Sequence, residues 1–346
     1  MRQNIKPKIA LLAAPETTPS VLFGLYDVLA SVGAGYADMT GRQVGEPLLD
    51  IRIVAADARP FRCFGNILIE PHAAIGDLDR VDAAVVCDMY TPIDTAPRGR
   101  YGLEIAWLRR MHAQGALIGS VCSGSLVLAE AGLLDGRQCA GHWAYRELFR
   151  RQYPKVNYCA DSILRLDSEA QGVITAGGVT AWQELALRLI SRYCSPEHAL
   201  QTAKVYLLSG HEDGQLPFAD MGMKIQGEDQ TIKLSQEWIA EHYAQANPVE
   251  AMTQRAGLNR RTFTRRFRAA TGHLPMDYVH AVRVEKAKRI IEQDAGGIDD
   301  VAYQVGYEDP TFFRRLFKRE VGLTPAAYRR KFSSILSDPT PAKGGH

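Results

Sequence analysis

The residue most suited to chemistry in the first half of the chain is a cysteine surrounded by small side chains. Residues 117–128 read LIGSVCSGSLVL, which predicts a strand, a tight turn with Cys122 at its apex, and a helix. Such a turn sets the side chain at a helix N-terminus, where the helix dipole favours a thiolate. The same geometry presents the nucleophile of many hydrolases. A lone cysteine after a strand is usually only a small buried residue, but the small residues on both sides favour a functional thiol.

A second candidate for chemistry is a basic segment near the C-terminus that repeats itself 50 residues further on. Phe263, Arg265, Phe267, Gly272, Pro275 and Tyr278 recur as Phe313, Arg315, Phe317, Gly322, Pro325 and Tyr328. Each copy predicts a short helix, a glycine turn, and a second helix whose two phenylalanines bury one face and leave cations on the other. This is the pattern of a helix-turn-helix, a DNA-binding motif. The alternative is a charged solvent face on an ordinary helical hairpin, which the duplication disfavours.

The turns of this repeat have specific end signals. Gly257 and Gly306 are predicted to end the first helices, at residues 248–256 and 298–305, because glycine accepts a positive φ. Asn259 and Asp309 are predicted to cap the second helices.

The elements that must position Cys122 alternate between strand and helix. Strands are predicted at residues 9–14, 51–55, 83–87, 116–120 and 173–175. Helices are predicted at residues 21–31, 103–113, 125–131, 144–152, 181–193 and 196–209. This alternation predicts an α/β domain of three layers, α/β/α, with a mostly parallel sheet covered on both faces.

The charge distribution separates this domain from the basic repeat. The net charge is +2, but residues 233–346 hold 19 Lys and Arg against 13 Asp and Glu, whereas residues 1–232 hold 22 against 26. A basic third suggests that only the C-terminal part meets a polyanion. We therefore predict an N-terminal ligand-sensing domain at 1–209, a linker at 210–232, an all-α DNA-binding domain at 233–332 and a disordered tail at 333–346.

The repeated pattern F-x-R-x-F-[KR] … G-x-x-P-x-x-Y, with a connecting helix at residues 276–291, resembles the DNA-binding domain of AraC-type transcriptional regulators. In that family each unit lays its second helix in a major groove. The resemblance implies DNA contacts from Arg260, Arg261, Thr264, Arg265 and Arg268 in the first unit, and from Thr311, Phe312, Arg314, Arg315 and Lys318 in the second. Pro310 opens the second recognition helix and cannot donate to a base, so we expect this unit to contribute less to base recognition.

Residues 5–195 resemble the PfpI-like group of the class I glutamine amidotransferase superfamily, whose domains have a flavodoxin-like fold. The continuation AEAGLLDGRQCAGHW places His142 where that group has a histidine near the thiol. A PfpI-like domain followed by an AraC-type domain resembles the regulators often called GlxA-like. The resemblance implies a transcription regulator that responds to a small metabolite, such as an amino acid or a quaternary amine.

The sequence departs from the enzymatic members of the PfpI-like group at three places. Ser123 stands where PfpI-type proteases have a histidine, and residues 88–90 (DMY) replace a Gly-Gly loop that supplies oxyanion donors. Val21 stands near the position of the usual acidic residue, and Glu16 is the nearest carboxylate in sequence. Because base, oxyanion donors and acid are all in question, we expect no enzyme activity.

A thiol without these partners can still line a ligand pocket, formed by loops at the carboxyl ends of the strands. The candidate ligand-binding residues are Glu16, Met89, Cys122, Ser123, His142, Trp143 and Gly177. The helix N-terminus by itself would attract an anionic ligand group such as a carboxylate. For His142, the alternative is a helix-start histidine with only a local hydrogen bond.

Three classes of function remain after these observations. The first is a DNA-binding regulator, expected to be a cytoplasmic homodimer without metal or cofactor. The second is a cysteine-dependent hydrolase or lyase that its basic domain tethers to nucleic acid. The third is a redox sensor that pairs Cys122 with Cys139, a minor option because the sequence shows no paired cysteines.

Overall fold

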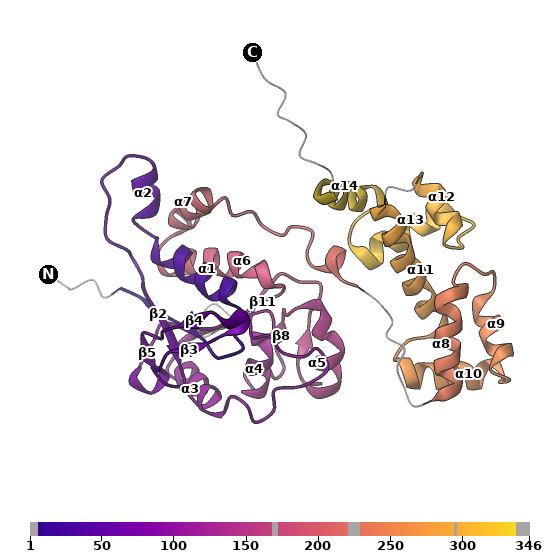
Figure 1. The fold of residues 1–346 in the computed structure, drawn as a ribbon, viewed down its shortest axis with the longest axis horizontal. Helices are drawn as coiled ribbons and strands as arrows, with labels where there is room; N and C mark the ends of the chain where they lie inside the picture. The colour runs from indigo at the N-terminus through magenta and orange to yellow at the C-terminus, as the bar shows by residue number, and fades with distance from the viewer. Residues whose placement is uncertain (1–5, 168–171, 221–228, 294–295, 337–346) are drawn as a thin grey trace, which may run out of the picture. The chain divides into compact units, whose positions relative to one another are not determined.

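The computed structural model describes residues 6–167, 172–220, 229–293 and 296–336. The chain forms two compact units, Met1–Gln215 and Leu216–His346; in Figure 1 the colour gives the residue number along the chain. The domain boundaries given above remain predictions. Residues 221–228 of the predicted linker and 337–346 of the predicted tail lie outside the described residues, and helix α14 (Pro325–Leu336) extends into the segment that we predicted as tail.

The N-terminal unit is built on a seven-stranded sheet in the order β10-β11-β7-β6-β1-β2-β5. All the neighbouring strands pair in parallel except β10 with β11. The strands are β1 (Lys8–Leu12), β2 (Asp50–Ala55), β5 (Ala73–Ala74), β6 (Ala83–Val86), β7 (Leu117–Val121), β10 (Leu164–Leu166) and β11 (Val173–Ala176). The predicted mostly parallel α/β architecture is therefore confirmed.

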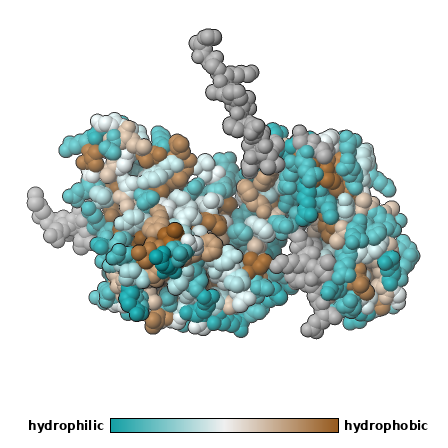
Figure 2. Space-filling model, viewed as in Figure 1, coloured by the Kyte–Doolittle hydropathy of each residue, from teal (hydrophilic) through white to brown (hydrophobic). Residues whose placement is uncertain are grey.

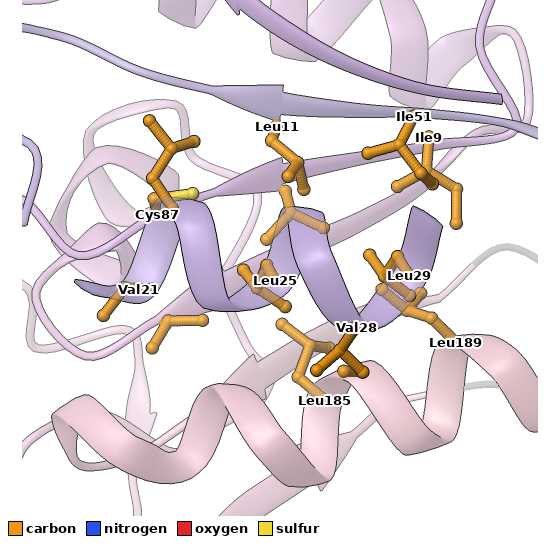
Figure 3. Packing of buried hydrophobic residues seen from close by; sticks show 14 of the residues in the cluster. Ile9, Leu11, Val21, Leu25, Val28, Leu29, Ile51, Cys87, Leu185 and Leu189 are labelled. Carbon is orange, nitrogen blue, oxygen red and sulfur yellow. The ribbon is translucent and has the colours of Figure 1, made fainter. Parts of the chain in front are cut away.

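Alternation along the strands produces the three layers. In β1, Ile9 and Leu11 face one core, which includes residues of α1 (Pro19–Ala30) and α6 (Trp182–Tyr193). Figure 3 shows Leu25 of α1 between the sheet and Leu185 of α6. Ala10 and Leu12 face the other core, with α3 (Gly102–Ala113), α4 (Gly124–Glu130) and α5 (Arg146–Gln152). Side chains two residues apart share a face of a strand, so continuous apolar runs supply both cores.

Several short elements were not predicted. They are strands β3 (Phe61–Arg62), β4 (Leu68–Ile69), β5, β8 (Gln138–Cys139), β9 (Asn157–Tyr158) and β10, and helix α2 (Gly35–Met39). Two-residue strands are too short to show a period of two. The predicted last helix of this unit is α7 (Pro196–Tyr206), which ends at Leu207 in the left-handed conformation.

The described part of the C-terminal unit is helical. Its helices are α8 (Gln230–His242), α9 (Pro248–Arg255), α10 (Arg260–Thr271), α11 (Pro275–Glu292), α12 (Ile298–Gln304), α13 (Pro310–Val321) and α14. They form two apolar cores, and the long helix α11 contributes to both. None of the helices in the described part of the chain is long and apolar enough to cross a bilayer.

The sequence repeat corresponds to a repeat in packing. Phe267 meets Tyr278 edge to face with ring centroids 5.3 Å apart, and Phe317 meets Tyr328 in the same way at 5.6 Å. The two turns repeat as well: Gly257 has φ 62° and Gly306 has φ 87°. The prediction of two helix-turn-helix units is confirmed.

Both predicted helix caps are present. The Asn259 side chain accepts a hydrogen bond from the Thr262 N–H at 2.9 Å, and the Asp309 side chain accepts one from the Thr311 N–H at 2.8 Å. These side chains satisfy N–H groups that a helix start leaves without intrahelical partners, so α10 and α13 have sharply defined first turns.

Candidate functional sites

Cys122 lies at a strained turn between β7 and α4, as predicted. Its φ of 54° is in the left-handed region, and 4% of the residue is exposed. A Cβ atom on Gly124 would lie 2.6 Å from the Val86 carbonyl oxygen and 2.8 Å from that of Cys87. Only glycine therefore lets the first turn of α4 approach β6 this closely.

A buried carboxylate lies beside the Cys122 thiol. Asp88 follows β6 and is 6% exposed. Its Oδ2 accepts a hydrogen bond from Thr18 Oγ1 at 2.5 Å, and its Oδ1 accepts from the Ser123 N–H at 3.2 Å and from Ser123 Oγ at 2.7 Å. Asp88 therefore already uses the first N–H group at the beginning of α4.

Burial and this carboxylate together oppose the predicted ionisation of the thiol. Burial is the main cause that raises the pKa of Cys122 well above its usual range, and the charge of Asp88 and a hydrogen bond to it raise this pKa further. The Ser123 N–H acts in the opposite direction but does not compensate. Our prediction of a favoured thiolate is wrong, because the residue is desolvated and faces a like charge.

The sequence analysis did not identify Asp88 as the partner of the thiol. Val21, near the position where an acid was sought, is fully buried in the core. The Glu16 carboxylate has other partners: it forms an ion pair with Arg100 and accepts a hydrogen bond from the Tyr101 hydroxyl at 3.1 Å. The signal that could have identified Asp88 is an acidic residue directly after a buried strand.

His142 caps the short helix η3 (Trp143–Tyr145), and its Nδ1 accepts a hydrogen bond from the Ala144 N–H at 3.2 Å. The local hydrogen bond expected for a helix-start histidine is thus present. Burial lowers the pKa of His142, while the charge of Asp88 acts to raise it. Because Nδ1 is an acceptor, the neutral imidazole carries its proton on Nε2.

Met89 and Ser123 are joined by hydrogen bonds beside Asp88. The Met89 N–H donates to Ser123 Oγ at 2.9 Å, and Ser123 Oγ also contacts the Met89 carbonyl oxygen. Both residues are almost completely buried. The Tyr145 hydroxyl donates a hydrogen bond to the Thr91 carbonyl oxygen at 2.6 Å. Burial, and then the charges of Cys122 and Asp88, raise the pKa of Tyr145.

Gln215, which lies in the predicted linker, packs against two of the predicted site residues. It is 3% exposed. Its Nε2 donates to the carbonyl oxygens of Gly141 at 2.9 Å and Ser162 at 2.8 Å, and its Oε1 accepts from the Trp143 N–H at 3.3 Å. A Cβ atom on Gly177 would lie 2.2 Å from Gln215 Nε2, so two predicted site residues, Trp143 and Gly177, meet this side chain.

The structure therefore divides the predicted ligand-binding residues into groups. The first group is close to Asp88 or has a pKa that its charge affects, and consists of Met89, Cys122, Ser123 and His142. The second group contacts Gln215 and consists of Trp143 and Gly177. The side chain of Glu16 belongs to a separate ion pair, although the Glu16 carbonyl oxygen accepts a hydrogen bond from the Tyr90 N–H at 2.8 Å. No cluster of three His, Cys, Asp or Glu side chains suited to a metal ion occurs in the described part of the chain.

The other candidate site is a shallow open groove along α10. It is lined by Arg260, Arg261, Thr264, Arg265, Arg268, Ala269 and Leu274. All the residues predicted to contact DNA in the first unit thus line one surface. Arg266 is different, because it forms a two-pronged ion pair with Asp229, the N-cap of α8. The surface shown over these C-terminal helices is largely hydrophilic (Figure 2).

On α13, the predicted contact residues have mixed surroundings. Thr311, Arg315 and Lys318 are exposed. Arg314 pairs with Asp299 of α12, so its charge is partly neutralised. Phe312 is 40% exposed and contacts the rings of His280 and Tyr307.

Two family models match the chain. The DJ-1/PfpI family model covers residues 8–192, and a helix-turn-helix domain model covers residues 252–331. HTH-type transcriptional regulator CdhR of Pseudomonas aeruginosa is 25% identical over 299 residues, which are 85% of this chain and 86% of that protein. HTH-type transcriptional regulator GlxA of Rhizobium meliloti is 29% identical over 231 residues, which are 66% and 69% of the two chains. The crystal structure of Drosophila melanogaster DJ-1beta covers 60% of this chain and 100% of its own, with 17% identity and a TM-score of 0.49.

Proposed function

The chain belongs to the DJ-1/PfpI family and carries an AraC-type helix-turn-helix domain, and from this premise we propose that it is a sequence-specific transcription regulator whose N-terminal domain senses a small molecule. The observation that carries the DNA-binding part is the groove along α10, where four arginines and Thr264 line one surface. Relatives over most of the chain are named HTH-type transcriptional regulators, which supports the same function.

In this proposal α10 enters a major groove of double-stranded promoter DNA. Arg265 is the residue placed to pair with a guanine, since a guanidinium can donate to its O6 and N7 together. Arg268 lies one turn further on and serves as a phosphate contact. Base contacts specify sequence, whereas phosphate contacts position the protein.

The test uses the full chain and an operator selected from a random duplex library. Arg265→Ala is expected to cost about 1–3 kcal/mol and to relax preference at one or two positions. Arg268→Ala is expected to weaken all sequences about equally and to reduce the salt slope by about one. Arg42→Ala, an exposed cation of the N-terminal unit, is the matched control. Selection of no preferred sequence, or equal profiles for both variants, would refute the assignment.

For the effector we propose a molecule with a cationic nitrogen, such as an amino acid or a quaternary amine. The support is Asp88, a buried carboxylate that accepts hydrogen bonds from two hydroxyls and a backbone N–H and from the Cys122 thiol, none of which carries a positive charge. A buried anion favours an opposite charge nearby. The expected attraction of an anionic group to α4 is withdrawn, because Asp88 occupies that helix start with its own negative charge.

We further propose that Cys122 lines this site and does not carry turnover. An acyl-transfer enzyme needs a thiolate and free N–H donors for the developing oxyanion. Here the pKa of the thiol is raised by burial and Asp88, and the Ser123 N–H is occupied by Asp88. The alternative, a cysteine-dependent hydrolase or lyase tethered to nucleic acid, requires both features to change.

Cys122→Ala separates the two functions. The variant is expected to keep its fold and its DNA affinity and to change the ligand concentration that alters DNA binding. Thermal shift with amino acids and quaternary amines on the wild-type chain identifies the ligand, because a ligand specific to the folded state stabilises it. Hydrolysis of an amide or peptide at enzyme-like rates, abolished in Cys122→Ala, would establish the enzyme instead.

We propose that the protein acts as a cytoplasmic homodimer. One copy of the helix-turn-helix pair covers two grooves, and a second copy raises affinity through effective concentration. Light scattering at micromolar concentration, with and without operator, tests this; a monomer in both conditions would contradict it.

A further inference from the structure

The second recognition helix carries an aromatic side chain that its core does not bury. Phe312 lies in the first turn of α13, and 40% of it is exposed. The next two phenylalanines, Phe313 and Phe317, are fully buried and supply the apolar face of the helix. Phe312 therefore lies on the same exposed side as the cations, at the end of a recognition helix that meets base edges.

The ring of Phe312 is held in place by an aromatic cluster. Its centroid lies 5.8 Å from that of His280 on α11 and 5.9 Å from that of Tyr307 in the turn before α13. His280 and Tyr307 stack 5.8 Å apart, with their ring planes at 11°, and His280 Nδ1 is 2.9 Å from the Tyr307 hydroxyl. A ring fixed in this way loses little side-chain entropy when it binds a partner.

Two of its neighbours on α13 have limited capacity for hydrogen bonds to bases. Pro310 has no N–H to donate, and Arg314 is engaged by Asp299. The equivalent of Phe312 in the first unit is Thr262, 50 residues earlier, and that unit presents its arginines to the groove along α10. The second unit also exposes Arg315 and Lys318, so it differs from the first in presenting an apolar ring beside its cations.

In the major groove, the apolar group that distinguishes one base from the others is the C5-methyl group of thymine. We propose that Phe312 recognises this methyl group in the part of the operator bound by the second unit. This inference rests on the proposed DNA-binding function and adds to it the kind of base that α13 recognises.

The test removes only the methyl group from the DNA. An operator is selected with the full chain, and each thymine bound by the second unit is replaced in turn by uracil, which pairs in the same way but lacks the methyl. Affinity is measured by fluorescence anisotropy at one salt concentration. The proteins are the wild type, Phe312→Ala, Phe312→Leu, and, as a control, Tyr303→Ala, which removes an exposed aromatic ring of α12 outside the recognition helix.

We expect uracil at one or two adjacent positions to weaken wild-type binding about fourfold, the loss for one methyl-sized group. Phe312→Ala is expected to bind the thymine operator correspondingly less tightly and to be insensitive to uracil there. Tyr303→Ala should keep the full uracil effect, and Phe312→Leu should keep part of it. Thermal unfolding checks that each variant is folded, and the uracil scan of the wild type needs no variant at all.

The inference is overturned if wild-type affinity is unchanged by uracil at every position in the second half-site. It is also overturned if Phe312→Ala retains the wild-type uracil effect, or if that half-site contains no thymine. In these cases an operator still exists, so the proposed function stands. If no operator can be selected, the proposed function fails and this inference fails with it.

Discussion

Replacing Gln215 by alanine should destabilise the N-terminal unit far more than its place in the predicted linker would suggest. The side chain is 3% exposed and makes three hydrogen bonds, with Gly141 O, Ser162 O and the Trp143 N–H. Alanine leaves these three backbone groups without that partner. A buried group that loses its partner costs about 1–3 kcal/mol, and water entering the vacated space recovers part of this. We expect a loss of about 3–5 kcal/mol.

The assay is urea unfolding of the full chain, followed by tryptophan fluorescence. Trp107, Trp143 and Trp182 belong to the N-terminal unit and only Trp238 to the other, so the signal reports mainly on the first. Because the chain has two units, the transitions are fitted separately rather than as a single two-state curve.

Two further variants separate the causes of this effect. Gln215→Met keeps most of the side-chain volume but cannot make the hydrogen bonds, so it should lose nearly as much as alanine. Gln201→Ala is the control, because Gln201 bonds only to the exposed Glu197 among the hydrogen bonds of the described residues, and its loss should stay within about 0.5 kcal/mol. If Gln215→Ala is no more destabilising than Gln201→Ala, the inferred stabilising role of the three Gln215 hydrogen bonds is wrong.

Two other predictions follow from single contacts. Gly306→Ala should cost about 2–5 kcal/mol, because φ is 87° and the new Cβ would lie 2.5 Å from the Ala244 carbonyl oxygen. Gly257→Ala, with φ of 62° but no atom within 4 Å, should cost only about 1 kcal/mol; equal losses in denaturant unfolding would contradict the steric explanation. Asp88→Asn should lower the pKa of Cys122 by removing a like charge, so the pH at which iodoacetamide alkylates the thiol should fall. An unchanged pH profile would show that burial alone sets the ionisation.

Much of the fold followed from local patterns in the sequence. The five predicted strands of the central sheet each overlap a strand of the structure, because continuous apolar runs are typical of a sheet covered on both faces. The ends of α10 and α13 also followed from the sequence, since Asn259 and Asp309 cap helices through their own side chains. The repeat of phenylalanine, glycine and tyrosine likewise predicted both helix-turn-helix units.

The electrostatics of the candidate sites did not follow from the sequence. Asp88 lies 35 residues before Ser123, and Gln215 lies 72 residues after Trp143. The two residues of each pair are therefore distant in the sequence and meet only in the folded chain. The ion pair of Arg314 with Asp299 joins two helices across a turn. The sequence determined the thiol, its turn and the cations of the recognition helices. The tertiary structure decided which of these groups are charged, buried or free to bind, because a pKa and a hydrogen bond depend on what packs against a side chain and not on its neighbours along the chain.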